Sequence, residues 1–163
     1  MQPLVFRKAT TEDFEKMEEW LYQNNSDFYV NYDEIEEDFK AGRMVVAERP
    51  VQDKMDWVGY YTHDTGFIPT FFEIRRDCRR QGIGEAMFEN LTNMALQAGV
   101  KEMTMLCNPP EAYTFWSKLG FKALPDSEQD GIGVKARAVI LPEFNFAAPT
   151  KQYPSVKEIK FTP

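Results

Sequence analysis

Hydrophobic positions near the N-terminus follow a strand pattern and then a helical one. Residues 5–8 predict a short first strand. Thr10, followed three positions later by Asp13, has the pattern of a helix N-cap with a capping box. Apolar side chains then recur at helical spacing, at Phe14, Met17, Trp20 and Leu21. Together these positions predict one helix that continues to about residue 22.

The following stretch predicts a second short helix and three strands. Asn31 and Glu34 repeat the capping pattern at the start of a helix that ends at Gly42. β-Branched and aromatic side chains then predict strands at residues 44–48, 57–62 and 68–75. A loop that holds Pro50 and Asp53 is expected between the first two of these strands.

The second half of the chain alternates helices and strands. A helix from about residue 81 to 97 is followed by Gly99, and a strand is predicted at residues 101–107. Asn108 and Pro109 then have the pattern of an N-cap and a first helical residue, which predicts a further short helix. Two last strands are predicted at residues 121–124 and 134–141.

This order of elements predicts an α/β fold with one mixed, mostly antiparallel sheet and helices on both faces. The early strands are close enough in sequence to form antiparallel hairpins. The strand–helix–strand passage over residues 68–107 should instead bring its two strands parallel by a right-handed crossover.

Chain length predicts one domain followed by a tail. The 163 residues suffice for one hydrophobic core and not for two, and we assign that core to residues 1–142. Residues 143–163 hold three prolines and several large apolar side chains. We expect this tail to pack on the domain or on a partner, by adding a strand to its own sheet or to that of a second copy in a homodimer.

Composition narrows the class of protein. The net charge of −7 argues against nucleic acid as a partner, because phosphates would be repelled. The chain has no apolar stretch near the roughly 20 residues that cross a bilayer, and its start lacks a signal-peptide pattern. Cys78 and Cys107 make no disulfide framework. We therefore expect a cytoplasmic protein that avoids membranes and nucleic acid, and we predict no metal site.

Acidic side chains are concentrated near the N-terminus. Between positions 11 and 40 only Lys16 and Lys40 oppose them. The acidic residues of this stretch are Glu12, Asp13, Glu15, Glu18, Glu19, Asp27, Asp33, Glu34, Glu36, Glu37 and Asp38. Such helices usually present a solvated face, and they can also attract a cationic substrate.

A glycine-rich turn with flanking arginines lies between the strand at 68–75 and the helix that follows it. Its sequence is Arg79-Arg80-Gln81-Gly82-Ile83-Gly84. Unpaired amides and the partial positive charge of a helix N-terminus can hold a phosphate, and two guanidinium groups add full charge. The turn could also be only a structural junction. The pattern favours an anion site that faces a phosphorylated cofactor.

Two blocks of sequence resemble the GNAT family of N-acetyltransferases. The segment Arg79-x-x-Gly82-x-Gly84 after a strand is similar to the acetyl-CoA-binding signature of that family. A second block with Phe115 and Trp116, which ends Lys118-Leu119-Gly120-Phe121, resembles the later helix of the family. The opening "FRKATTEDFEKMEEWL" is also similar to the first strand and helix. Spacing and element order agree over roughly residues 4 to 141.

The resemblance implies a sheet split like a V between two central parallel strands, with acetyl-CoA in the gap. It implies that main-chain groups near Ile74 and Arg76 pair with the pantetheine arm and polarise the thioester carbonyl. It implies that Asn108 contacts the arm from the other side, although an N-cap role also explains this residue. The pyrophosphate would be bound by the turn, at Arg79, Arg80, Gln81, Gly82, Ile83, Gly84 and Glu85.

Two positions depart from the family pattern. Family members often have a tyrosine in the later helix that protonates the departing thiolate, where this chain has Trp116, whose N–H is no useful acid. Tyr113, one turn earlier, is our candidate for that role, and packing or cofactor contact also explains it. Asn108 and Ala112 are one residue further apart than the usual spacing.

Glu73 is the candidate general base. It occupies an apolar strand next to the expected thioester. A lysine-like amine has a pKa near ~10.4, so at pH 7 it must lose a proton before it can attack. Strand alternation equally allows Glu73 to point to solvent. A thiol ionises near ~8.5, so its departure needs little acid help, and backbone donors would carry the larger oxyanion stabilisation.

The leading hypothesis is an N-acetyltransferase that passes the acetyl group of acetyl-CoA to a primary amine by direct attack in a ternary complex. The acceptor could be a small molecule or a protein amine, and the acidity favours a cationic one. A second hypothesis is a GNAT-like module that binds CoA without turnover, as a sensor or interaction domain. A nucleotide-binding domain of another type is disfavoured, because repeated βαβ units and an acidic ribose partner are missing.

Overall fold

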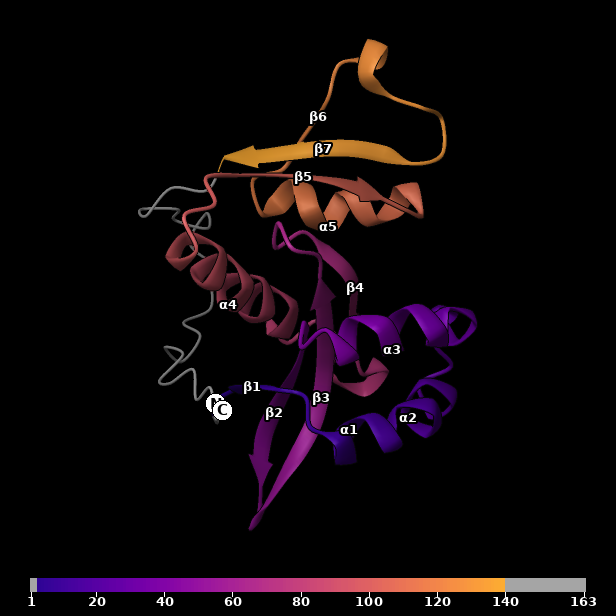
Figure 1. Cartoon of the computed structure of the whole chain (residues 1–163), viewed down its shortest axis with the longest axis vertical. Coiled ribbons are helices and arrows are strands. Elements are labelled where there is room, and N and C mark those ends of the chain that lie inside the picture. The colour runs from indigo at the N-terminus through magenta and orange to yellow at the C-terminus, as the bar shows by residue number, and fades with distance from the viewer. Residues whose placement is uncertain (1–2, 140–163) are drawn as a thin grey trace. The chain divides into compact units, whose positions relative to one another are not determined.

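The computed structural model describes residues 3–139 and divides into two compact units (Figure 1). The N-terminal unit comprises residues 3–64 and 69–90 of the described chain, and the C-terminal unit comprises residues 65–68 and 91–139. The predicted tail at 143–163 and the predicted domain boundary at 142 lie outside the described residues.

The N-terminal unit is built on a four-stranded antiparallel sheet in the order β1-β2-β3-β4. Its strands are β1 (Val5–Lys8), β2 (Met44–Val51), β3 (Lys54–His63) and β4 (Pro69–Ile74). The loop expected around Pro50 is instead the end of a hairpin that pairs as far as Val51 and Lys54. Within the described part of the chain β1 reaches only Glu48, so Pro50 lies where β2 is an edge, a place that tolerates proline.

The helices of this unit are α1 (Thr11–Glu15), α2 (Met17–Gln23) and α3 (Tyr32–Lys40), with a 3₁₀ helix η1 (Asp27–Asn31) before α3. The capping box of Thr10 and Asp13 is confirmed. The prediction of one helix to residue 22 was wrong, because the chain tightens at Lys16, whose N–H donates to the Asp13 carbonyl at 3.2 Å. This turn preserves the apolar spacing, so periodicity does not reveal it.

The N-cap of α3 is at the predicted residue, but the predicted capping hydrogen bond is not formed. Asn31 occupies the N-cap position, but its side chain makes no capping hydrogen bond. Its amide nitrogen donates instead to Glu34 Oε1 at 3.2 Å. The reason is that α3 follows η1 directly, so the chain already turns helically before Asn31 and leaves no extended residue for the cap.

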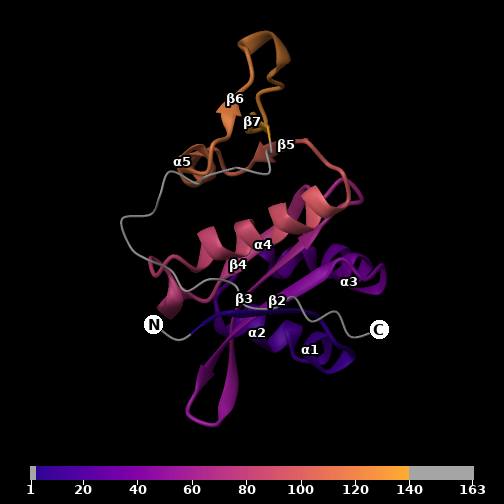
Figure 2. The same ribbon diagram turned by 90° about the vertical axis from the view of Figure 1, so that its left-hand side faces the viewer.

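Helices cover both faces of the N-terminal sheet (Figure 2). One face packs against α1 to α3 in a buried cluster of Met17, Leu21, Ile35, Met44, Val46, Tyr60 and Phe71. On the other face, α4 (Ile83–Gln97) approaches so closely that a Cβ at Gly59 would lie 3.0 Å from Met87 Sδ. The predicted class, a mostly antiparallel α/β fold with helices on both faces, is confirmed.

The connection from β4 to α4 is short and strongly bent. A 3₁₀ turn, η2 (Arg76–Cys78), follows the strand, and two left-handed residues come next, Arg80 at φ 60° and Gly82 at φ 79°. Helix α4 begins immediately afterwards, in the N-terminal unit, and continues into the C-terminal unit. Residues 75–82 therefore connect the end of β4 to the N-terminus of α4.

The C-terminal unit has its own antiparallel sheet in the order β5-β7-β6. Its elements are β5 (Glu102–Cys107), η3 (Pro110–Ala112), α5 (Tyr113–Lys118), β6 (Lys122–Ala123), η4 (Asp126–Glu128) and β7 (Val134–Val139). Every strand pair within residues 3–139 is antiparallel, and β4 and β5 belong to different sheets. The parallel course expected of these two strands stays a prediction.

Candidate functional site

Ile74 presents its main-chain groups at an edge of the N-terminal sheet. The Arg75 N–H donates to the Val58 carbonyl at 2.8 Å, so the Arg75–Val58 pair is hydrogen-bonded. Because antiparallel pairs alternate, the neighbouring pair of Ile74 and Gly59 is not, and the Ile74 N–H and C=O point away from β3. Among residues 3–139, β4 is the last strand of this sheet, so these groups lie at its edge. The Ile74 carbonyl accepts a hydrogen bond from Arg79 Nε at 3.1 Å.

The glycine-rich turn forms a helix N-terminus with the features of an anion site. The first bond of α4 joins the Ala86 N–H to the Gly82 carbonyl at 3.1 Å, so the amides before Ala86 precede the helical ladder. Gly82 has no side chain that could cap them. The guanidinium-bearing Arg79 and Arg80 are exposed beside this end of the helix. Unpaired donors, the helix dipole and two cations together suit a phosphate group.

The residues predicted to bind phosphate differ in their burial and in their hydrogen bonds. Ile83 and Gly84 are buried, so only their main-chain groups can serve a ligand. The Glu85 side chain is half-buried, and its Oε2 has no hydrogen-bond partner among the described residues. The Gln81 side chain is engaged within the turn, since its Nε2 donates to the Asp77 carbonyl at 3.1 Å. The structure brings these residues together with Arg79, Arg80 and Gly82 in one bend, and their contact with a cofactor stays a prediction.

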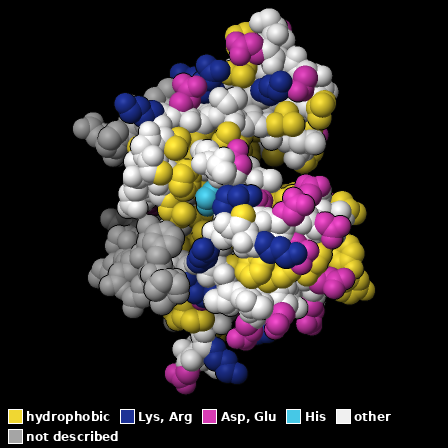
Figure 3. All heavy atoms as spheres, viewed as in Figure 1, with side chains coloured by type: hydrophobic (Ala, Val, Ile, Leu, Met, Phe, Trp, Pro, Cys, Tyr) yellow, Lys and Arg dark blue, Asp and Glu magenta, His cyan; other side chains and the backbone are white. Residues whose placement is uncertain are grey.

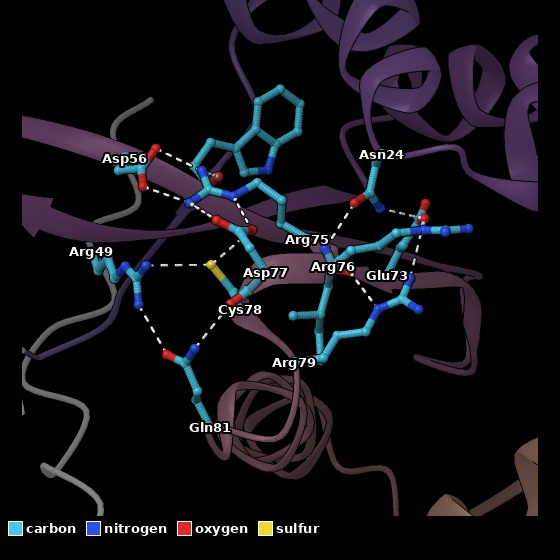
Figure 4. A network of polar contacts seen from close by, with 12 residues as sticks. Asn24, Arg49, Asp56, Glu73, Arg75, Arg76, Asp77, Cys78, Arg79 and Gln81 are labelled. Atoms are coloured by element: carbon cyan, nitrogen blue, oxygen red, sulfur yellow. Dashed lines mark hydrogen bonds and ion pairs between the residues drawn. The ribbon is translucent and has the colours of Figure 1, made fainter.

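Arg49 joins this bend from β2 (Figure 4). Its Nη1 donates to Gln81 Oε1 at 3.0 Å, and its Nη2 lies 3.4 Å from Cys78 Sγ. Arg49 thus adds a third guanidinium beside the turn. Sequence reasoning missed it, because it stands 32 positions before Gln81 and no local pattern links the two. Only the pairing of β2 with β3, and of β3 with β4, brings it there.

Arg75 is held in an ion-pair cluster at the end of β4. Its Nη1 and Nη2 contact both carboxylate oxygens of Asp56 at 2.7 and 2.9 Å, and its Nε contacts Asp77 Oδ1 at 2.7 Å. The hydrogen bond from Arg75 lowers the pKa of Asp77. This cluster uses up the charge of Arg75, so the other arginines supply the positive charge near the turn.

Glu73 is a buried carboxylate, with 7% of its surface exposed. Asn24 Nδ2 donates to Oε1 at 2.7 Å and Ser26 Oγ donates to Oε2 at 2.6 Å. The Tyr60 hydroxyl lies 3.4 Å from Oε2, and Arg79 Nη2 lies 3.9 Å from Oε1. The alternative that Glu73 points to solvent is therefore wrong, because its face of β4 is covered by the segment after α2.

Burial raises the pKa of Glu73 above the ordinary value of a glutamate. The hydrogen bonds from Ser26 and Asn24 act in the opposite direction, as does the nearby charge of Arg79. A carboxylate with a raised pKa accepts a proton more readily near neutral pH than an ordinary one. The environment thus suits Glu73 to proton transfer.

Asn24 connects Glu73 to the backbone after β4. Its Oδ1 accepts a hydrogen bond from the Arg76 N–H at 2.8 Å, while its Nδ2 holds Glu73. The Arg76 amide, expected to serve the cofactor, is thus already paired, and Ile74 is the better placed of the two. The sequence signals Asn24-Asn25-Ser26 only as a polar turn after a helix, which does not distinguish these roles.

A surface cavity of about 310 Å³ opens beside Asn24. It is lined by Trp20, Gln23, Asn24, Arg75, Arg76 and Asp77. Trp20 forms its aromatic wall and stacks on Trp57 with ring centroids 5.2 Å apart, while it meets Tyr60 edge-on. The cavity therefore shares Asn24 with the buried carboxylate of Glu73.

Tyr113 and Asn108, the remaining predicted site residues, belong to the C-terminal unit. The half-buried Tyr113 accepts a hydrogen bond on its hydroxyl oxygen from the Ala123 N–H at 3.1 Å, so its own O–H proton can still be donated. Trp116 is 7% exposed and packs edge-on against Phe121, as a core residue does.

The prediction that Asn108 caps the following helix was wrong. Asn108 is exposed, and Pro109 is the N-cap of η3, with φ −67° and ψ 161°. The reason is the second proline, Pro110, which disfavours the helical conformation for the residue before it. The helical turn therefore starts one residue later than predicted, and Asn108 is left without a capping role.

The acidic residues near the N-terminus form an exposed face. Their side chains gather over the region of α1 to α3 (Figure 3). The exposed members are Glu12, Glu15, Glu18, Glu19, Asp27, Asp33, Glu34 and Glu37. Asp38 is an exception, since it is buried and bonded to Arg43 Nη2 at 2.8 Å.

Residues 3–139 have neither a metal-ligating cluster nor a helix that could span a membrane. No group of three histidine, cysteine, aspartate or glutamate side chains in this range is placed to hold a metal ion. None of the helices in this range combines the length and the apolar character that crossing a membrane requires.

Solved structures share this fold at low sequence identity. An acetyltransferase of the GNAT family from Bacillus cereus superposes with a TM-score of 0.61 at 14% identity, covering 85% of this chain and 98% of its own. The PaiA N-acetyltransferase from Thermoplasma acidophilum, in complex with coenzyme A, has a TM-score of 0.59 at 15% identity, with 83% and 98% covered. N-acetylglutamate synthase from Neisseria gonorrhoeae, complexed with coenzyme A and N-acetyl-glutamate, has a TM-score of 0.61 at 12% identity, with 85% and 35% covered.

The sequence itself also matches a known family. No curated protein is matched by the chain. Residues 9–137 match the family described as the acetyltransferase (GNAT) domain, which is more than half of the 163 residues. That range includes β4, the glycine-rich turn and α4. This chain therefore belongs to the GNAT acetyltransferase family.

Proposed function

We propose that this protein is an acetyl-CoA-dependent N-acetyltransferase, which passes the acetyl group to a primary amine by direct attack in a ternary complex. One observation carries the proposal. The end of β4 joins a buried carboxylate, Glu73, to a turn whose left-handed Arg80 and Gly82 open a fifteen-residue helix. Coenzyme A complexes of the structurally similar proteins support the choice of cofactor.

The chain has residues that fit such a cofactor. The amides at the start of α4 and the side chains of Arg79 and Arg80 would hold the diphosphate. The Ile74 main chain at the edge of β4 would orient the pantetheine arm and donate its N–H to the thioester carbonyl. We also assign Asn108 a contact with this arm, as the resemblance implies. When bound, acetyl-CoA supplies an acetyl carbon that is open to attack and a thiolate that can leave.

Glu73 is proposed as the general base. An ammonium group cannot attack, so the acceptor amine must first lose a proton, and a buried carboxylate with a raised pKa can take it directly or through a water. The neutral nitrogen then forms the new C–N bond while the C–S bond breaks. We propose that the Tyr113 hydroxyl returns a proton to the departing thiolate, a step of small benefit because thiols ionise near ~8.5.

The acceptor is proposed to be a small or protein-borne amine that carries positive charge. The exposed acidic face over α1 to α3 supports this, since it would raise the local concentration of cations.

We further propose that the protein acts in the cytoplasm without nucleic acid or membrane partners, and that the tail at 143–163 contributes to a homodimer. Light scattering of a chain ending at residue 141 tests the last point.

Replacement of Gly82 by alanine tests the cofactor site. At φ 79° an alanine side chain is strained and distorts the turn, so acetyl-CoA should bind at least tenfold more weakly. Gly99→Ala is the matched control, because Gly99 has a similar φ of 82° with nothing within 4 Å of its Cβ position. Isothermal titration measures both affinities. Equal affinity in the Gly82 variant and the parent would contradict the proposed site.

A second candidate is a GNAT-like module that binds CoA without turnover, as a sensor or interaction domain. The specific observation in its favour is that Trp116 is packed in the core where the family pattern has an acid. Thiol release from acetyl-CoA with a broad panel of amines separates the two functions. Turnover with any amine that Gly82→Ala reduces rejects the binding-only candidate, and tight binding without thiol release rejects the enzyme.

A further inference from the structure

We infer that Asn24 is a positioning residue for acetyl transfer, which orients the Glu73 carboxylate and fixes the backbone at the end of β4 with the same side chain. This inference rests on the proposed function, in which Glu73 is the general base. No sequence pattern assigns Asn24 such a role. It depends on three segments that meet at one amide group: the end of α2, β4 and the turn after β4 (Figure 4).

The contacts of Asn24 leave it little freedom. The residue is 4% exposed, and its own N–H donates to the Trp20 carbonyl at 2.9 Å as the C-cap of α2. Its Nδ2 lies 2.7 Å from Glu73 Oε1 and its Oδ1 lies 2.8 Å from the Arg76 nitrogen. The orientation of the amide is determined by these partners, because a main-chain N–H only donates and an ionised carboxylate only accepts.

Most of the groups that donate hydrogen bonds to the Glu73 carboxylate are neutral. β3 supplies the Tyr60 hydroxyl, the segment after α2 supplies Asn24 and Ser26, and the turn supplies Arg79 at 3.9 Å. Arg79 is the charged group in this set, and it is 49% exposed, so water screens it. Each neutral donor stabilises the ionised carboxylate. Loss of the Asn24 donor should therefore leave Glu73 more often protonated, and so unable to accept a proton.

The second contact of Asn24 serves the backbone. Arg76 is two residues beyond Ile74, whose main chain we propose for the pantetheine arm. Pairing of the Arg76 N–H with Asn24 defines the direction in which the chain leaves β4 for η2 and the glycine-rich turn. The Arg76 side chain supports the same junction, since its Nη2 donates to the Asn25 carbonyl at 2.9 Å. One amide thereby couples the proposed base to the proposed cofactor edge.

Asn24→Asp separates the two contacts. An aspartate keeps an oxygen for the Arg76 N–H, but it has no donor for Glu73 and adds a like charge beside it. We expect kcat/KM for the amine to fall about tenfold or more at neutral pH, as for loss of a hydrogen bond to a charged group. The acidic limb of the pH profile should move to higher pH, with partial recovery of activity in alkali. A merely structural role would lower activity at all pH values alike.

Asn25→Asp is the matched control. Asn25 is the exposed neighbour of Asn24, and aspartate also tolerates its left-handed φ of 46°. It adds the same charge one residue away, so its pH profile should match that of the parent. An equal shift in both variants, or an unchanged profile for Asn24→Asp, overturns the inference.

The parent protein supplies a readout that needs neither a variant nor activity. In an NMR titration, the side-chain amide protons of Asn24 should shift with the same midpoint as the Glu73 carboxyl carbon, because the two groups share a hydrogen bond. Absence of a common midpoint overturns the inference even if Asn24→Asp fails to fold. Full activity of Glu73→Gln would instead reject Glu73 as the base and leave the shared titration as the test of the Asn24 contact.

Discussion

At the scale of single residues, Glu73 combines burial with donors supplied from other elements. A carboxylate on an apolar strand is expected to be costly to fold, because burial disfavours its charged form. Here Asn24, Ser26 and Tyr60 surround it, and Arg79 lies at the edge of this group. A buried carboxylate that is surrounded by donors in this way is more typical of a functional site than of a structural role.

Glu73→Gln should therefore have opposite effects on activity and on stability. We expect kcat/KM to fall by about 100-fold or more, as for loss of a general base. The pKa of Glu73 is raised by burial, so its ionised form disfavours folding at neutral pH, above both the ordinary value of 4.5 and the folded-state value. The glutamine avoids this cost, and the free energy of unfolding at pH 7 should not decrease. Urea denaturation and steady-state kinetics measure the two effects. A variant that loses both stability and activity would contradict this account.

At the scale of elements, a helix cap forms only where the local sequence signal and the preceding or following backbone both allow it. The capping box at Thr10 forms as predicted, because both partners lie within one helical turn. Asn31 and Asn108 have the same kind of sequence signal and do not cap, because η1 precedes one and a second proline follows the other. Element positions were predictable within a few residues, whereas the use of each cap depends on what the chain does just before it.

Thr10→Ala tests this division directly. Loss of the side-chain cap should lower the free energy of unfolding by about 1 kcal/mol. Asn31→Ala, at an N-cap position with no side-chain capping bond, should cost much less. Thermal or urea unfolding compares the two variants. Equal losses would mean that the Thr10 capping box is no more important to stability than an ordinary surface contact.

At the scale of the whole molecule, β1, α1 and β2 are joined by one ionic cluster. Arg7 contacts Asp13 Oδ1 at 2.8 Å and Glu48 Oε1 at 2.7 Å, and Asp13 also accepts from Thr10. Burial by itself would raise the pKa of Asp13, but the hydrogen bonds from Arg7 and Thr10 outweigh it and lower that pKa below 3.8. The cluster therefore makes the packing of β1 and α1 against β2 sensitive to acid.

The contribution of Asp13 to stability should depend on pH. A lowered folded-state pKa stabilises the fold fully above the ordinary value of 3.8, and this stabilisation is lost as the pH falls through the folded-state pKa. Asp13→Asn should thus destabilise the protein at pH 7, with a difference that shrinks below pH 3.8. Glu12→Gln is the control, since its ion pair with Lys16 is exposed and should matter little. Unfolding free energies across pH 2–7 provide the measurement, and a pH-independent difference for Asp13→Asn would oppose the expectation.

Much of the site follows from the sequence alone. The order of elements, the strand before the turn, the glycines that open α4 and the flanking Arg79 and Arg80 are all local features, since each depends on neighbours a few positions away. A glycine can be assigned to a left-handed bend, and a helix start to unpaired amides, without knowledge of the rest of the chain. Residues 9–137 accordingly match the GNAT domain, and the proposed anion site lies within this range.

Tertiary structure alone decided which polar side chains meet. Asn24 reaches Glu73 and Arg76 across 49 and 52 positions, and Arg49 reaches Gln81 across 32. These contacts depend on strand register and on how the segment after α2 covers β4, which arise from packing between distant elements. Burial of Glu73 follows from the same packing. The chain thus specifies its proposed cofactor turn locally, while the environment of its proposed base exists only once the sheet and helices have assembled.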